Sequence, residues 1–481
     1  MNRTRSLTLL LVGAALSLGG CAYNGGQKTL SGASDLSSVE APAPTKAKNV
    51  ILFIGDGMGI STITAARIYD GQKRGETGEE NILSFENFEN VALVKTYNTN
   101  AQVPDSAGTA TAMHSGKKTR IGVVGIGPEA ERGSCADALA YPLPLLGEEA
   151  KRRGLGLGIV STARLTHATP ASVYSRSADR NWESDGAIPE DERGKGCKDI
   201  ATQLIEADWD VALGGGLGAF FGSDKGGRRL ATSADLPATW SARTGGTFVT
   251  DNAEMQAASM GKPLLGIFSP SHMTYEAEKD GTKGVDEPTL TDMTANALAR
   301  LENNREGFYL MVESGRIDHA HHAGIAGWAL EETVEFARAI QYAIDNTDPV
   351  ETLIMVTADH SHVFTIAGYP RRGNDILGLV VPPAGDISNT EEPVQAKDGK
   401  PYTTLGYWNG PGAVAHHHEH GRPVPQTGLN AQQQAVVPLG SETHAGEDVA
   451  LYASGPGADR VRGVIEQNVI YDIIRDAFGW E

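Results

Sequence analysis

The stretch NVILFIGDGMG, residues 49–59, sets an uninterrupted apolar run directly before an acidic residue in a glycine-rich turn. Two later stretches repeat this arrangement, GFYLMVESGRIDHAHH at 307–322 and TLIMVTADHSH at 352–362. Runs of this kind predict strands, and ligands of open α/β sheets bind beyond the carboxyl ends of the strands. A single acid after a strand is usually a turn residue or a helix cap, but three such acids favour a shared site. The acids and histidines that follow the runs are Asp56, Glu313, Asp318, His322, Asp359 and His360.

Outside these stretches, short apolar runs alternate with longer helix-like segments through residues 48–481, and no internal repeat is visible. The alternation predicts an α/β fold, a three-layer sandwich around a large, mainly parallel β-sheet. Residues 366–437 break the pattern with Gly, Pro and polar residues, so we interpret them as an insertion in the 48–481 catalytic domain. Their tract HHHEH, 416–420, is more typical of a solvated loop than of a built metal site.

The composition limits the classes of function. The chain has 481 residues, 40% of them hydrophobic, and a formal net charge of −19. Such an excess of carboxylates disfavours a broad nucleic-acid-binding face, so no specific nucleic-acid partner is expected.

The N-terminus has the features of an export signal. MNRTR is basic, SLTLLLVGAALSL is apolar but too short to span a membrane comfortably, and LGGC ends at Cys21. We predict a signal peptide over 1–20, lipidation of Cys21, and a flexible tether over 21–47 rich in Gly, Ser, Ala and Pro. The alternative is a plain secretory signal with a chance cysteine. Either places the protein outside the cytoplasm, on the periplasmic side or at the cell surface, and the lipid would anchor it to a bacterial membrane.

Export also affects the interpretation of the other two cysteines, Cys135 and Cys197. In an oxidising compartment such a pair favours a structural disulfide over two free thiols. Their spacing does not indicate a metal site.

The segment VPDSAGTATAM, 103–113, places Ser106 between an aspartate and a run of small residues. Serine in this context most often caps a helix. A nucleophile at the start of a helix is the alternative, and one residue could serve as both.

The residue types after the strands suit divalent metals. Carboxylates with imidazoles suit zinc at a catalytic position, and oxygen ligands suit magnesium. Because Glu313, Asp318 and His322 cannot share one face of a straight helix, we expect Glu313 and His322 to serve different metals from a loop. His444, in SETHAGED, and Arg180, in SADRNW, would be unremarkable surface or core residues on their own.

Taken in order, DGMG, PDSAGTATA, HATP…RNW, ESGRIDHAHH, TADHSH and ETHAGED resemble the motifs of the alkaline phosphatase family, and they span residues 49 to about 457. RNWESD, GCKDIATQL and GYPRRG are closer to its animal-type branch than to its enterobacterial branch. The resemblance implies hydrolysis of small phosphate monoesters, a homodimer, a disulfide between Cys135 and Cys197, and a dimer-contacting "crown" at the 366–437 insertion.

By the same resemblance each subunit would hold two Zn²⁺ and one Mg²⁺. The implied ligands are Asp318, His322 and His444 for the first zinc, Asp359, His360 and Asp56 for the second, and Asp56, Thr169 and Glu313 for magnesium.

The remaining implied roles concern phosphate. Ser106 would be the nucleophile that becomes phosphoserine, and Arg180 would bind the non-bridging phosphate oxygens. His167 and His319, which replace an aspartate and a lysine of the enterobacterial branch, would tune the magnesium water and contact phosphate. Ser269 stands where the animal branch has an acidic calcium ligand, so no calcium site is predicted.

Three other functions are alternatives to a phosphomonoesterase. A phosphodiesterase or nucleotide pyrophosphatase on a similar core would commonly present a threonine nucleophile, and a sulfatase would need a different signature at Ser106. A non-enzymatic metal- or phosphate-binding surface protein would keep the ligands without needing Ser106.

Overall fold

A computed structural model describes residues 46–279, 286–385, 392–414 and 421–480. The chain divides into two units, Met1–Ala43 and Pro44–Glu481, and every described residue belongs to the second. The predicted signal peptide, Cys21 and the HHHEH tract lie outside the described residues, as does nearly all of the predicted tether. At the tether's end, Ala47 is buried and donates a backbone hydrogen bond to Ala477.

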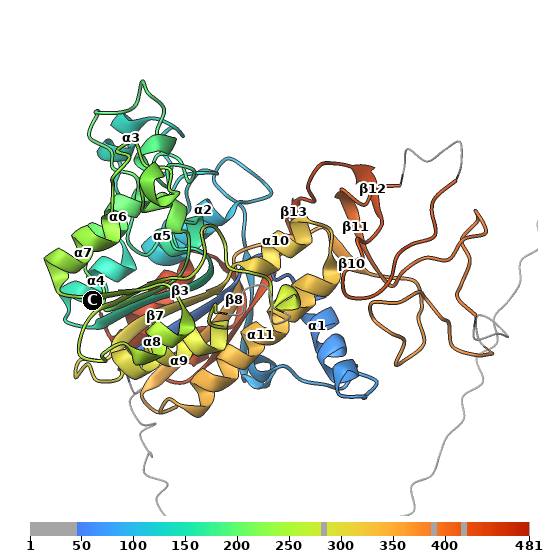
Figure 1. The fold of residues 1–481 in the computed structure, drawn as a ribbon. Helices are drawn as coiled ribbons and strands as arrows, with labels where there is room; N and C mark the ends of the chain where they lie inside the picture. The colour runs from blue at the N-terminus through green and yellow to red at the C-terminus, as the bar shows by residue number, and fades with distance from the viewer. Residues whose placement is uncertain (1–45, 280–285, 386–391, 415–420, 481) are drawn as a thin grey trace, which may run out of the picture. The chain divides into compact units, whose positions relative to one another are not determined.

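A ten-stranded sheet forms the centre of the second unit, and only β14 runs against the direction of the other strands (Figure 1). In spatial order the strands are β15 (Gly463–Glu466), β2 (Asn90–Lys95), β14 (Val449–Ser454), β8 (Thr352–Ala358), β1 (Asn49–Gly55), β7 (Phe308–Ser314), β3 (Gly156–Arg164), β4 (Val211–Gly215), β6 (Leu264–Ile267) and β5 (Thr247–Val249).

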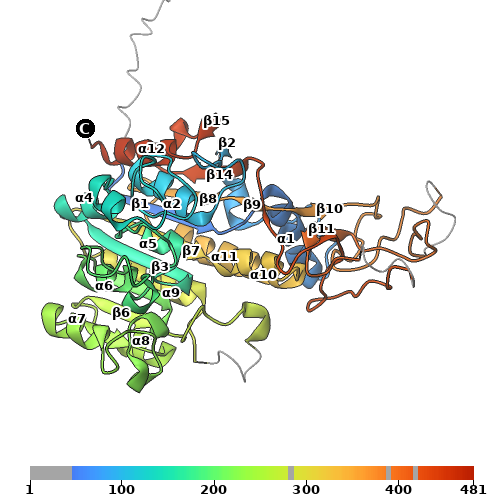
Figure 2. The same cartoon turned by 90° about the horizontal axis from the view of Figure 1, so that it is seen from above.

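Helices cover both faces of this sheet, which confirms the predicted three-layer α/β fold (Figure 2). One layer contains α1, α9 and α11, and the other contains α2, α4, α5 and α12. The helices are α1 (Ile60–Lys73), α2 (Ser106–Ser115), α3 (Cys135–Ala140), α4 (Leu146–Arg152), α5 (Ala168–Ala171), α6 (Ile200–Glu206), α7 (Leu236–Thr244), α8 (Asn252–Ala257), α9 (Leu290–Leu301), α10 (Arg316–His322), α11 (Ala326–Asp345) and α12 (Val469–Phe478). No helix in the described ranges is long and apolar enough to cross a membrane.

The three apolar runs identified in the sequence are the central strands β1, β7 and β8. Every residue of β7 and β8 is buried, as are all residues of β1 except Asn49. Strands buried on both faces need continuous apolar sequence, which explains the unbroken runs. On one face Phe53 packs edge-on against Phe336 of α11, with ring centroids 5.9 Å apart. Because β1 lies between β7 and β8, their carboxyl ends meet at one edge.

A separate small sheet spans the predicted insertion, with β10 (Phe364–Ile366) at its start, β11 (Leu405–Gly410) inside it and β12 (Ala435–Pro438) at its end. A two-stranded pair consists of β9 (Ser361–His362) and β13 (His444–Ala445). Along the chain β9 lies between β8 and β10, and β13 lies between β12 and β14. The register of this pair sets His444 opposite His362, and so brings a histidine from near the C-terminus to the edge where β8 ends.

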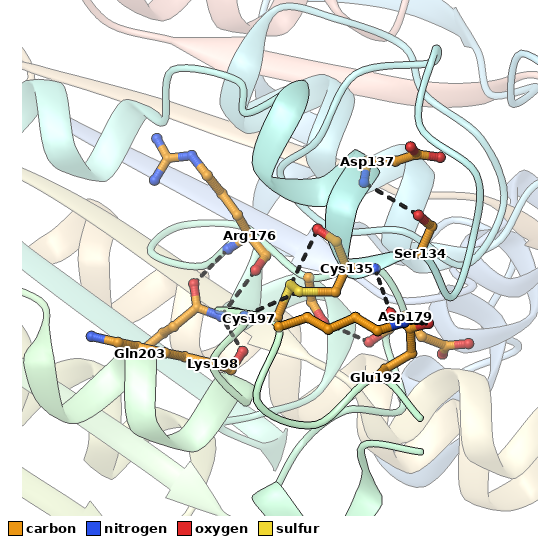
Figure 3. The surroundings of a disulfide bond; sticks show 11 residues. Ser134, Cys135, Asp137, Arg176, Asp179, Glu192, Cys197, Lys198 and Gln203 are labelled. Carbon is orange, nitrogen blue, oxygen red and sulfur yellow. Dashed lines mark hydrogen bonds and ion pairs between the residues drawn. A yellow bond between two sulfur atoms is a disulfide. The ribbon is translucent and has the colours of Figure 1, made fainter. Parts of the chain in front are cut away.

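The disulfide between Cys135 and Cys197 is present, with the two Cα atoms 5.7 Å apart (Figure 3). Cys135 belongs to a second, small apolar core that also contains Trp182. Arg180 lies between Cys135 and Cys197 in the sequence, and its backbone N–H donates to the carbonyl of Gly122. The bond therefore cross-links the part of the fold that presents Arg180.

Candidate active site

Ser106 is the first residue of helix α2, but it does not cap the helix. The cap is Asp105, whose Oδ1 accepts a hydrogen bond of 3.1 Å from the N–H of Gly108. The expectation that Ser106 itself would cap α2 was therefore wrong. The carboxylate of Asp105, one residue earlier, already accepts the N–H that a capping side chain would bind. The Ser106 hydroxyl is left to face the cavity.

Asp105 also positions Arg180. Its Oδ2 accepts hydrogen bonds from Arg180 Nη1 at 2.9 Å and from the N–H of Gly122 at 3.0 Å. Burial alone would raise the pKa of Asp105, but the Arg180 charge and the backbone donors outweigh it and hold the pKa below its ordinary value. The Asp105 carboxylate thus connects the start of α2 to the guanidinium.

The Ser106 hydroxyl lies among metal-type ligands. Its Oγ is 3.4 Å from Asp56 Oδ1 and 3.2 Å from His360 Nε2, and the residue is only 2% exposed. The sequence around Ser106 shows no histidine, and only the fold supplies His360 from the end of β8. The other nitrogen of His360, Nδ1, contacts the carbonyl of Ser361, so Nε2 is the one directed at Ser106.

Asp318, His322 and His444 come together as one ligand group. His322 Nδ1 is 2.6 Å from the carbonyl of Glu442, and His444 Nδ1 is 2.8 Å from the carbonyl of Pro104. Each Nδ1 must therefore carry the proton, because a carbonyl can only accept. The two Nε2 atoms then face each other at 3.1 Å, and both lie 3.3 Å from Asp318 Oδ1. Two imidazole nitrogens that face each other beside a carboxylate form a pocket that a cation would fit.

His362 lies in the same cluster but differs from its neighbours. Its Nε2 is 2.8 Å from Asp318 Oδ1, and its Nδ1 is 2.5 Å from Glu442 Oε2. Burial lowers the pKa of His362, but the two carboxylates outweigh that effect and raise it to about 10. With both nitrogens engaged, His362 orients Asp318 rather than offering a ligand atom.

The segment from Glu313 to His322 is not the predicted loop. Glu313 lies inside β7, and Asp318, His319 and His322 lie on the short helix α10. The expectation of a loop was wrong because the strand continues through Glu313 and the helix begins two residues after the strand ends. Asp318 and His322 are four residues apart and so share one helix face.

Glu313, Asp56 and His167 form a further group, with Thr169 on α5 close by. Glu313 Oε2 accepts a hydrogen bond from Ser161, whereas Glu313 Oε1 and Asp56 Oδ2 are buried without a partner in the described part of the chain. Burial raises the pKa of Glu313 to about 7 against the lowering effect of Ser161. Unpaired buried carboxylate oxygens are costly, and a bound cation is one way of satisfying them.

Asp359 completes the centre of the site. Its Oδ1 accepts the N–H of Gly57 at 3.0 Å, and its Oδ2 lies 3.3 Å from His360 Nε2. Gly57 has a φ of +70°, and a Cβ there would lie 2.4 Å from His362 Nε2. The glycine after Asp56 in GDGMG is therefore needed for both its conformation and its small size.

A cavity of about 370 Å³ opens over these groups. Its far wall holds Arg164, which makes two hydrogen bonds of 2.7 Å to Glu183 and also contacts His272. His272 in turn packs on His319, with ring centroids 4.0 Å apart. His167 lies at the same wall with Nε2 3.0 Å from Arg180. A larger cavity of about 680 Å³ lies beside the disulfide, but of the predicted site residues only Cys197 lines it.

The structure thus brings together every metal-ligand and phosphate-binding residue expected from the sequence. Sequence reasoning missed several residues that support them, although four stand inside quoted motifs, at PDSAGTATA, RNWESD, TADHSH and SETHAGED. The missed residues are Asp105, Arg164, Glu183, His272, His362 and Glu442.

A serine hydroxyl beside three groups of buried acids and histidines, at the carboxyl edge of a doubly wound sheet, defines a class of protein: metal-dependent hydrolases with a hydroxyl nucleophile. The family model for alkaline phosphatase matches residues 47–479. The chain therefore belongs to the alkaline phosphatase family, and it is a metal-dependent phosphomonoesterase.

Individual relatives agree with this assignment. The chain is 45% identical over 445 residues to the tissue-nonspecific alkaline phosphatase of Gallus gallus, covering 88% of this chain and 83% of that protein. It is 43% identical over 465 residues to the Homo sapiens isozyme, covering 92% and 85%. Among solved structures, the Thermus thermophilus alkaline phosphatase superposes with a TM-score of 0.66 at 25% identity, over 91% of this chain and 92% of that one.

Proposed function

We propose that this phosphatase works through a phosphoserine at Ser106, supported by two Zn²⁺ and one Mg²⁺. The observation that carries the proposal is the facing pair of Nε2 atoms on His322 and His444, 3.1 Å apart beside Asp318. That arrangement fits bound divalent cations, as do Asp56 Oδ2 and Glu313 Oε1, which have no hydrogen-bond partner among the described residues.

The proposal assigns each metal its own set of ligands, with Asp56 shared between the second zinc and magnesium. Asp318, His322 and His444 would hold one zinc, and Asp359, His360 and Asp56 the other. Asp56, Glu313 and Thr169 would hold magnesium. His167 Nδ1 is buried without a partner in the described residues, so His167 would bind the magnesium or its water. When bound, the metals supply positive charge to the attacking and leaving oxygens and favour ionisation of a bound hydroxyl or water.

The protein's own groups then carry out the reaction. Arg180, held by Asp105, binds two non-bridging phosphate oxygens, and the N-terminus of α2 points its free N–H groups at the same phosphate. Ser106 Oγ bonds to phosphorus as the bond to the ester oxygen breaks, and the alcohol leaves with a proton. Water then attacks the phosphoserine, phosphate departs, and Ser106 regains its hydrogen.

Chelation and Ser106→Ala test this proposal. Hydrolysis of a chromogenic monoester should stop with chelator, return with zinc plus magnesium, and exceed that of a matched diester. Ser106→Ala should fold and bind zinc normally but lose at least a thousandfold in kcat. Preference for the diester would favour the phosphodiesterase alternative, and an active Ser106→Ala protein would refute the phosphoserine.

We also propose export, anchoring through lipid on Cys21, and homodimerisation. The basic, apolar and LGGC segments support the first two. Exposed apolar side chains on or beside the small β10–β11–β12 sheet support the third, with Trp408 60%, Val436 51% and Leu439 42% exposed. Mass spectrometry of the mature N-terminus and light scattering of the purified protein test these statements.

A further inference from the structure

A second cavity, of about 190 Å³, adjoins the active-site cavity. The two cavities share Asn181 and Glu183 as lining residues. The rest of the second cavity is lined by Ser184, Gly186, Ala187 and Arg228. None of these four residues has a role in the phosphoryl-transfer site described above.

The arginines along the two cavities differ in their charge balance. Arg180 is paired with Asp105, and Arg164 is paired through two hydrogen bonds with Glu183. Arg228 is exposed and makes no ion pair or side-chain hydrogen bond with the described part of the chain. Among the described residues it is therefore the arginine of this wall that no carboxylate pairs, in a protein with a formal net charge of −19.

Backbone contacts fix where Arg228 lies. Its N–H donates to Gly218, and the N–H of Gly218 donates to Pro270. A Cβ placed on Gly218 would lie 3.5 Å from Arg228 Nε and 3.2 Å from the Pro270 carbonyl, so the guanidinium lies over Gly218 at the Pro270 turn.

The same turn contacts Arg164 on its other side. Arg164 Nη1 donates to Ser271 at 3.4 Å and contacts His272. The turn from Pro270 to His272 therefore contacts both Arg228 and Arg164. Because the two cavities share Asn181 and Glu183, a long leaving group could extend from the active-site cavity to Arg228.

We propose that the second cavity is a subsite for an anionic group on the leaving alcohol. The preferred substrates are phosphate monoesters with a second phosphate or carboxylate at the far end of the leaving alcohol, as at the two ends of a hexose bisphosphate. Arg228 binds this second anion, and the Asn181 amide lies where the leaving group passes between the cavities. The inference rests on the proposed function at Ser106, because it names the substrate class of that site.

The test compares three substrates that differ at the far end: a hexose 6-phosphate, the matching 1,6-bisphosphate, and the 6-phosphate of the hexonic acid. Arg228→Gln should lower kcat/KM for the bisphosphate about tenfold, chiefly through KM, and should leave the hexose 6-phosphate nearly unchanged. Arg228→Lys should recover part of the loss, and added salt should shrink it. Arg305→Gln is the control, since Arg305 is exposed at the amino end of β7, far from the cavities.

The hexonate decides which anion the subsite takes. If Arg228→Gln lowers kcat/KM for the hexonate as much as for the bisphosphate, the subsite accepts any anion. If kcat/KM for the hexonate falls less, the subsite prefers phosphate. Equal changes for all three substrates, or an effect matched by Arg305→Gln, would overturn the subsite while leaving the phosphatase mechanism intact. If the wild-type enzyme hydrolysed no monoester at all, the proposed function would fail, and the subsite with it.

Discussion

Asp105→Asn should separate the two tasks of the carboxylate that precedes the nucleophile. Four donors surround Asp105: Asn98 Nδ2 and the N–H of Gly108 at Oδ1, and Arg180 and the N–H of Gly122 at Oδ2. Asparagine has one acceptor oxygen and turns an NH₂ group toward the other two donors.

The expected magnitude follows from these contacts. Losing the charge-assisted bond to Arg180 and leaving a buried N–H unsatisfied should lower the free energy of unfolding by about 3 kcal/mol. Because Arg180 loses its anchor, KM for a small monoester and Ki for inorganic phosphate should both rise about tenfold or more. Urea denaturation with saturating metal and steady-state kinetics measure the two effects.

Asp199→Asn is a matched control. Asp199 caps α6 through the N–H of Thr202 at 2.9 Å and makes two hydrogen bonds of 3.0 Å to Arg229, away from Ser106. The Asp199→Asn protein should lose about as much unfolding free energy as Asp105→Asn, but its KM and Ki should be unchanged. If Asp105→Asn altered KM and Ki no more than Asp199→Asn, the claim that Asp105 positions Arg180 would be refuted.

Two further predictions concern stability. Replacing Cys135 and Cys197 with alanine removes a cross-link with a sequence separation of 62 residues and should cost about 4 kcal/mol of unfolding free energy; an unchanged denaturation midpoint would contradict this. Burial raises the pKa of Glu332 to about 8, and the charge of Glu276 adds to the rise. At pH values between the ordinary pKa of a glutamate and about 8, Glu332 keeps a proton in the folded protein that the unfolded chain releases. The contribution of Glu332 to stability therefore falls as the pH rises and is lost above about pH 8. Glu332→Gln should therefore gain stability over the wild type from pH 5 to pH 9, by roughly 5 kcal/mol at most. A stability difference that does not vary with pH, in parallel urea denaturations, would show that the carboxyl is not kept neutral by the fold.

The sequence by itself determined the architecture and most of the residues that meet at the site. Continuous apolar runs can be buried on both faces only in the middle of a parallel sheet, and the acids that follow such runs must gather at its carboxyl edge. This reasoning applies directly to Asp56 and Asp359. The family motifs add Ser106, Arg180 and His444, because residues with specialised chemistry stand at recognisable spacings in each motif.

Only the tertiary structure decided how each side chain uses its hydrogen-bonding atoms. His322, His362 and His444 look equivalent in sequence, yet backbone carbonyls occupy Nδ1 of two of them, and two carboxylates occupy both nitrogens of His362. The partners come from segments up to 340 residues away, so no local pattern encodes them. The same holds for Arg228, because its lack of an ion-pair partner among the described residues depends on which acids the fold brings near it.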